Sequence, residues 1–358
     1  MLDLMDDLFA YNAWANSRVW RLCEGLGDDA LDAPQPIGFG SLRATLYHIL
    51  AAEEVWVERW QRKPWRPFPK DPEGAATQSM ADRLPVAAAA RQVILDAGRE
   101  DRWAEEVDFV DSRQQPHRWR LADQLLHVVN HGTHHRAQAL QFLKRLGRSA
   151  GPGLDYIFYR LGSSAVPQSS EAAEMLRGYG FDVGVREDSP PSWDPGVVLR
   201  WFVYHDWATE QILNLAAAAE DSQLDIDHNI GRGSIRGNLL HMYDVENAWV
   251  GKWSGDDSRF GQQSGPLTVA ELRGRWADLA AQRNTWLGAA DAQQTGRVIE
   301  VSFGGGRPAI RFQLGETVLQ TANHATHHRS QVINQLRRTG VEVRNIDLLY
   351  ALPELPKV

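Results

Sequence analysis

Residues 37–60 read IGFGSLRATLYHILAAEEVWVERW, and residues 230–253 repeat them as IGRGSIRGNLLHMYDVENAWVGKW. A direct count finds 11 of the 24 positions identical. In both segments a serine precedes apolar residues spaced three and four apart, a pattern typical of an amphipathic helix behind its N-cap. The segment that most clearly predicts a helix therefore occurs twice, at an offset of 193 residues.

The same offset relates two further motifs. YNAWAN at residues 11–16 returns as YHDWAT at residues 204–209, and NHGTHHRAQ at residues 130–138 returns as NHATHHRSQ at residues 323–331, with 7 of 9 positions identical. Self-similarity at a fixed offset indicates that one structural unit is repeated. A chain of 358 residues is also long enough for two domains of ordinary size. The sequence therefore predicts a duplicated domain.

A segment rich in proline and glycine separates the two copies. It covers residues 166–195 and contains Pro167, Gly178, Gly180, Pro190, Pro191 and Pro195. These residues interrupt regular structure and suit a linker, although a short helix is expected near residues 170–177. We place the first domain at about residues 1–165 and the second at about residues 196–358.

Within each copy the apolar periodicity is helical. Residues 4–22 carry apolar side chains at steps of three or four, Ser41 opens the second helix, and Thr268 with Glu271 forms a capping-box pattern before a third helix. The other expected elements are helices at about residues 81–98, 121–146 and 314–339, and short hairpins within 107–120 and 298–312. The expected fold is all-α, with two tandem four-helix bundles whose metal sites would form between facing helices.

Composition excludes several classes of function. The net charge of −8 argues against the large basic surface that nucleic-acid binding needs. Cys23 is the only cysteine, which excludes an intramolecular disulfide and a cysteine-rich metal site. The acidic start lacks the features of a signal peptide, and no stretch is apolar enough to span a bilayer. We expect a cytoplasmic protein without a nucleic-acid or membrane partner.

The histidines form the strongest chemical pattern. His131 and His135 are four residues apart on a predicted helix, so that their rings project from one face, and His324 and His328 repeat the arrangement. A further histidine lies 83 residues upstream in each copy, His48 in the first and His241 in the second. We predict that each trio binds one ion. The histidines without a counterpart, His117, His127, His205 and His228, are not expected to be ligands.

Three neutral imidazoles without a thiolate or carboxylate suit zinc, nickel or copper better than magnesium or calcium. Zinc or nickel is the expected metal, with two ions per chain. Zinc would lie about 2.0 to 2.1 Å from each ring nitrogen and would keep a fourth position for water or a substrate atom, as in catalytic sites. The sequence shows no obvious fourth protein ligand, and it identifies no catalytic residue beyond the ligands.

Several repeated residues flank the predicted ligands. His134 and His327 are interpreted as second-layer or helix-packing residues, and Gln138 and Gln331 return to the metal face, where they could contact a bound ligand. Arg136 and Arg329 are interpreted as ion-pair partners of a neighbouring helix, with substrate binding as the alternative. Glu53 and Glu246 are interpreted as partners in structural salt bridges. Asp155 and Asp347 either orient a histidine or cap a terminal helix, and Tyr11, Trp14, Tyr204 and Trp207 are interpreted as core or pocket wall.

These motifs together resemble the DinB/YfiT-like family: YNAWAN, a histidine in Leu46-Tyr47-His48, and HGTHHRAQ, with counterparts throughout the second half. The resemblance implies four-helix bundles of up-down-down-up type, each holding a metal with its three histidines. It also implies dimerisation, which the tandem copies would satisfy as an intramolecular pseudo-dimer, with a homodimer as the alternative. The second copy has His205 and Thr209 where the first has Asn12 and Asn16, so the two pockets need not be equivalent.

The resemblance also implies a metal-dependent transferase or isomerase that uses a low-molecular-weight thiol. A metal with an open position lowers the pKa of a bound thiol or a bound water, and the residues do not choose between the two. The leading hypothesis is a thiol S-transferase acting on small electrophiles. The alternatives are a metal-dependent hydrolase or isomerase, and a non-catalytic metal-binding stress-response protein.

Overall fold

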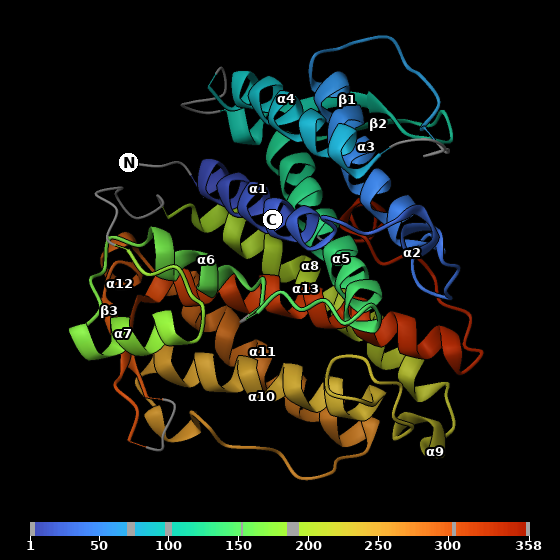
Figure 1. Cartoon of the computed structure of the whole chain (residues 1–358). Helices are drawn as coiled ribbons and strands as arrows, with labels where there is room; N and C mark the ends of the chain where they lie inside the picture. The colour runs from blue at the N-terminus through green and yellow to red at the C-terminus, as the bar shows by residue number, and fades with distance from the viewer. Residues whose placement is uncertain are drawn as a thin grey trace. The chain divides into compact units, whose positions relative to one another are not determined.

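The structure is a computed structural model that describes residues 4–69, 76–96, 102–151, 153–184, 193–302 and 306–355. These residues are mostly helical, with two short hairpins, so the predicted all-α fold is confirmed. Packing divides the chain into two compact units (Figure 1). The N-terminal unit contains residues 5–150 and 347–349, and the C-terminal unit contains residues 151–346 with the extreme ends of the chain.

The N-terminal unit is built on four long helices. They are α1 (Leu4–Leu22), α3 (Leu42–Trp60), α4 (Thr77–Asp96) and α5 (Leu121–Arg145). Short elements join them: α2 (Asp28–Asp32), the 3-10 helix η1 (Arg102–Ala104), and the antiparallel strands β1 (Glu106–Val110) and β2 (Pro116–Arg120). The expected helices and the hairpin are all present, and α5 directly follows β2.

The C-terminal unit repeats this plan. Its long helices are α8 (Pro195–Ala217), α10 (Ile235–Ser254), α11 (Val269–Ala289) and α13 (Leu314–Arg338), and β3 (Val298–Val301) pairs with β4 (Ile310–Gln313). The shorter elements are α6 (Tyr156–Ser163), α7 (Ser170–Gly178), α9 (Asp221–Leu224), η2 (Asp257–Arg259), α12 (Ala292–Thr295) and α14 (Leu348–Ala351). The first two residues of α14, 348 and 349, belong to the N-terminal unit.

Side-chain caps fix where the second helix of each unit begins. Ser41 accepts a hydrogen bond from the backbone N–H of Ala44, and Ser234 accepts one from Gly237. The capping box predicted at Thr268 and Glu271 is present at the start of α11. Each cap pairs a backbone N–H that the first helical turn leaves without a partner, and it thereby sets the register of the helix that follows.

The central helix of each unit is buried over most of its circumference. In the N-terminal unit α5 packs along α3, and in the C-terminal unit α13 packs along α10 and α8 (Figure 1). Polar side chains on α5 and α13 therefore lie in the interior, where they need hydrogen-bond partners or a bound ion. These two helices carry four of the six predicted ligands.

The segment after α5 packs with the C-terminal unit. Arg160 of α6 forms a fully buried ion pair of 2.9 Å with Glu316 of α13, and Gln320 of α13 accepts a hydrogen bond from the backbone of Ile157. Residues 151–165 thus pack with the C-terminal unit, and the domain limits of 1–165 and 196–358 stay a prediction from the repeat. Within the predicted linker, the expected short helix is present as α7, and residues 185–192 lie outside the described residues.

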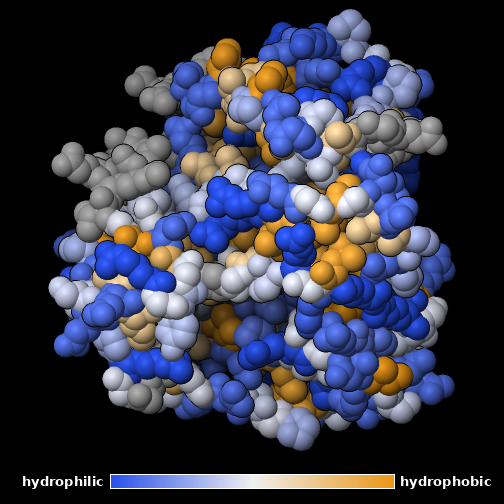
Figure 2. Space-filling model, viewed as in Figure 1, coloured by the Kyte–Doolittle hydropathy of each residue, from blue (hydrophilic) through white to orange (hydrophobic). Residues whose placement is uncertain are grey.

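The visible surface is mostly hydrophilic, with separate hydrophobic groups between the polar ones (Figure 2). Large apolar side chains that remain exposed include Phe39, Val86 and Tyr179. In the parts of the chain that the structure describes, no helix combines the length and the apolar character needed to cross a bilayer.

Candidate metal centres

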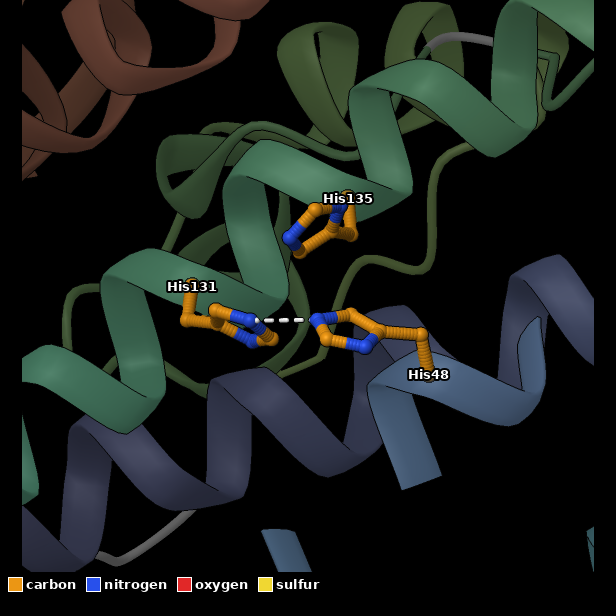
Figure 3. A group of neighbouring side chains, drawn as sticks. All are labelled: His48, His131 and His135. Atoms are coloured by element: carbon orange, nitrogen blue, oxygen red, sulfur yellow. Dashed lines mark hydrogen bonds between the residues drawn. The ribbon is translucent and has the colours of Figure 1, made fainter. Parts of the chain in front are cut away.

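The first cluster joins three histidines from two helices of the N-terminal unit. His48 comes from α3, whereas His131 and His135 come from α5, one turn apart (Figure 3). Nε2 of His48 lies 2.8 Å from Nε2 of His131, and the ring centroids of His48 and His135 are 4.7 Å apart. One nitrogen from each ring lies within 4.8 Å of the other two. A single ion between them is within reach of all three rings.

The second cluster repeats the first in the C-terminal unit. His241 comes from α10, and its ring centroid lies 5.1 Å from that of His324 and 4.7 Å from that of His328, both on α13. The three candidate ligand atoms again lie within 4.8 Å of one another. The structure thus brings all six predicted ligands together as two separate trios.

Burial favours the neutral form of five of the six imidazoles. It lowers the pKa of His48 and, together with the nearby Arg232 guanidinium, lowers the pKa of His241 to about 4. The pKa values of His131, His324 and His328 are also lowered well below the ordinary value, chiefly because burial disfavours the charged ring. A neutral imidazole offers a lone pair to a metal, so the ligand sets are ready to bind a cation at neutral pH.

A glutamine orients one ligand in each cluster. Oε1 of Gln138 lies 2.8 Å from Nδ1 of His135, so this nitrogen donates and Nε2 is left to face the centre of the trio. Nε2 of Gln138 lies 3.0 Å from Nε2 of His134 and donates to it, so this ring nitrogen of His134 is already engaged. The sequence places Gln138 on the metal face, where the structure shows it bonded to the outer nitrogen of His135.

The C-terminal cluster has the same glutamine arrangement. Gln331 lies 2.8 Å from Nδ1 of His328 through Oε1, and 2.8 Å from Nε2 of His327 through Nε2. A hydrogen bond to the outer nitrogen of a metal-binding histidine fixes the tautomer and the ring orientation, and raises the basicity of the ligand. The repeat preserves the residues that orient the ligands as well as the ligands themselves.

The aromatic residues of the opening motif lie elsewhere. Tyr11 and Tyr204 are buried, and the hydroxyl of Tyr204 donates to the backbone oxygen of Ile346. The ring of Trp14 lies 6.2 Å from that of Tyr11, and Trp207 donates to Glu354. Their described contacts are those of packing residues, and none of these contacts is with a histidine of the two trios.

A buried polar network lies behind the first cluster. Glu53 forms an ion pair with Arg91 and accepts a hydrogen bond of 3.4 Å from Asn12. Arg136, adjacent to a predicted ligand, donates to Asn12 and Asn16. Glu53 therefore forms the ion pair expected of it, whereas Arg136 donates to the neutral side chains of Asn12, Asn16 and Thr133. A buried carboxylate and guanidinium need such partners because burial without them is costly.

The second cluster has the equivalent network, with a histidine in place of an asparagine. Nε2 of His205 donates to Glu246 over 3.0 Å, and Nδ1 of His205 accepts from Arg329 over 3.1 Å. Glu246 also forms an ion pair with Arg283. His205 has no sequence counterpart and was not expected to be a ligand, and the structure gives it a buried hydrogen-bonding role. His205 therefore takes the place of Asn12 in this network, between the buried glutamate and the buried arginine.

His127 and Asp155 make contacts that the sequence did not indicate. His127 lies one turn before His131, with ring centroids 5.5 Å apart, and burial lowers its pKa to about 3. Asp155 stands at the N-cap position of α6, but its side chain accepts a hydrogen bond from Gln320 over 3.2 Å and makes no capping hydrogen bond. Helical spacing could have identified His127, because 127, 131 and 135 share one face.

The donor sets fit a borderline divalent metal. Each trio offers three neutral imidazoles, and neither includes a fourth histidine, cysteine or carboxylate among the described residues. Such a set favours zinc, nickel or copper and leaves a coordination position for an exogenous ligand. The arrangement resembles a catalytic metal site more than a closed structural one.

Comparison with known proteins agrees with the repeat. The model of the DinB family matches residues 1–165 and again residues 197–355. Protein DinB of Bacillus subtilis (strain 168) is 23% identical over 169 residues, which cover 44% of this chain and 95% of that protein. No solved structure matches. Because the family model covers almost the whole sequence in two segments, the chain belongs to the DinB family and carries its domain twice in tandem.

Proposed function

We propose that the protein is a metal-dependent thiol S-transferase that conjugates a low-molecular-weight thiol to small electrophiles. The observation that carries the proposal is the convergence of three neutral imidazoles in each unit without a fourth protein ligand among the described residues. A divalent metal bound there would lower the pKa of a thiol at its open position. Zinc or nickel suits the donors, with two ions per chain.

The residues of the chain would hold the site rather than supply the nucleophile. Gln138 and Gln331 fix two of the ligand rings, and the engaged His134 and His327 are kept out of the ligand set. The lone thiol, Cys23, is fully buried, and burial raises its pKa to about 12. Because a thiol of this kind is unreactive, the attacking thiol has to come from a cosubstrate.

Two alternatives use the same ligands. Water at the open position would give a hydrolase, and a bound thiol that adds reversibly to a substrate would give an isomerase. A non-catalytic metal-binding stress-response protein would use the ions for stability, because metal binding to a folded site adds to folding free energy.

The test is a panel of cellular thiols incubated with a bimane electrophile and the metal-loaded protein. The proposal expects conjugation with at least one thiol, loss of conjugation on chelation, and retention of the folded circular dichroism signal. Rapid turnover of esters or amides without any thiol would instead favour the hydrolase. Unfolding on chelation, with no turnover before it, would favour the structural alternative. Separate His48→Ala and His241→Ala variants report whether one unit or both are active.

A further inference from the structure

The loop before the second helix places a different side chain at each metal centre. In the N-terminal unit it reads Gly38-Phe39-Gly40, and in the C-terminal unit it reads Gly231-Arg232-Gly233. The first glycines have φ of 49° and 57°, and the second glycines have φ of 87° and 89°. These left-handed values favour glycine, so the two loops share one backbone course and differ in the residue between the glycines.

Close packing holds this loop against the glutamine that orients a ligand. A Cβ atom at Gly38 would overlap Oε1 of Gln138, and a Cβ atom at Gly231 would overlap Oε1 of Gln331. In the C-terminal unit the backbone N–H of Arg232 also donates to Oδ1 of Asn238 over 3.0 Å, and this oxygen lies 3.4 Å from Nδ1 of His328. The loop is therefore fixed directly beside the ligands.

An aromatic wall borders the first centre. The ring of Phe39 lies 3.9 Å from that of His48 and 5.3 Å from that of His135, and Phe68 lies 5.1 Å from His48 on centroid distances. Phe39 is 48% exposed, although it is a large apolar side chain. An apolar or aromatic group on a metal-bound ligand would cover this exposed ring and gain free energy by doing so.

At the second centre the equivalent loop position holds Arg232 in place of Phe39. Arg232 is exposed, and none of the ion pairs among the described residues includes it. The residue lies beside the ligands, because its backbone N–H and Nδ1 of His328 both contact Oδ1 of Asn238. Within the described chain, the rings that contact His241 are those of its partners His324 and His328. A positive side chain next to a cation site disfavours the bare ion and favours an ion that carries an anionic ligand.

We propose that the two metal centres accept different ligands: the N-terminal centre takes ligands with an aromatic or other apolar group against Phe39, and the C-terminal centre takes anions, such as carboxylates, that pair with Arg232. This inference rests on the metal sites of the proposed function, and it assigns a substrate class to each. The duplication would then provide one chain with two specificities.

The experiment uses the full chain loaded with Co²⁺, whose visible absorption reports ligands that enter the coordination sphere. A His324→Ala/His328→Ala variant leaves the N-terminal centre alone, and a His131→Ala/His135→Ala variant leaves the C-terminal centre alone. Each is titrated with acetate, imidazole and 4-phenylimidazole. Phe39→Arg and Arg232→Phe exchange the two side chains, and Phe39→Leu and Arg232→Gln are matched controls.

We expect acetate to bind the C-terminal centre roughly fivefold more tightly than the N-terminal one, with a loss of this preference in Arg232→Phe and Arg232→Gln. We expect the N-terminal centre, and only that centre, to bind 4-phenylimidazole about fivefold more tightly than imidazole. Phe39→Arg should make the two affinities equal. Phe39→Leu should keep most of the preference for 4-phenylimidazole over imidazole.

Two results would overturn the inference. Equal acetate and 4-phenylimidazole affinities at both centres, with Co²⁺ bound, would refute the assignment of ligand classes and leave the metal sites standing. A chain that binds no Co²⁺ through the histidines would refute the proposed function and the inference together. Circular dichroism of each variant separates these results from misfolding.

Discussion

Gln138 accepts a hydrogen bond from His135 over 2.8 Å, and it does so from a position three residues further along the same helix. The equivalent bond between Gln331 and His328 has the same length. The sequences around the two sites have diverged, but both units keep the glutamine that bonds Nδ1 of this histidine and leaves Nε2 for the ion. The bond predicts that the glutamine contributes to metal affinity through the histidine and without touching the ion.

Replacement of Gln138 tests that role. Gln138→Leu removes the acceptor, so the affinity of the N-terminal centre for zinc should fall by about 10- to 100-fold. Gln138→Glu retains an acceptor for Nδ1 of His135 and should restore most of the affinity. Competition with a chromophoric chelator measures both variants in a His324→Ala background. Equal affinities for Gln138→Leu and the parent would show that the glutamine only packs.

The exchange of Asn12 for His205 between the units predicts which substitution the C-terminal network tolerates. Asn12 donates to Glu53 and accepts from Arg136, and His205 donates to Glu246 and accepts from Arg329. His205→Asn keeps both functions, whereas His205→Leu keeps neither. The leucine variant should therefore lose about 1–3 kcal/mol more free energy of unfolding than the asparagine variant. Urea denaturation monitored by fluorescence measures the difference, and a leucine variant as stable as the asparagine variant would contradict the account.

Ionisation of Asp155 should make the free energy of unfolding depend on pH. Burial raises the pKa of Asp155 from its ordinary value of 3.8 to about 6. Between these values the folded state retains a proton that the unfolded state has released, so this group's stabilising contribution is fully present below the ordinary value and is lost as pH rises through the folded value. Asp155→Asn removes this contribution. The variant should gain in stability relative to the parent as pH rises from about 4 to about 7, and a constant difference in denaturation midpoint across that range would show that Asp155 does not titrate in this way.

The long helices were predictable because their apolar residues repeat at helical spacing and their caps are visible in the sequence, as at Ser41 and Thr268. The hairpins followed from β-branched and aromatic residues around turns. The packing of α6 against α13 was not predictable, because the buried pair of Arg160 and Glu316 joins residues 156 positions apart. No local pattern encodes a contact at that distance.

The candidate ligands were predictable because spacing on one helix, and repetition of a third histidine, constrain where the rings point. The role of Gln138 was only half predictable. Helical spacing placed it on the ligand face, but whether it meets the ion or a ring depends on side-chain rotamers and on the loop at Gly38 that presses on it. The role of His205 could not be predicted, because this histidine does not repeat and its role depends on a buried glutamate 41 positions away.

Metal content measured on tag-free protein tests the central claim most directly. Elemental analysis after reconstitution with zinc should find two ions per chain, one ion in His131→Ala/His135→Ala, and none when His324→Ala/His328→Ala is added. Each variant should remain helical by circular dichroism. Two ions retained in the variant that lacks all four histidines, or none bound by the parent chain, would contradict the account.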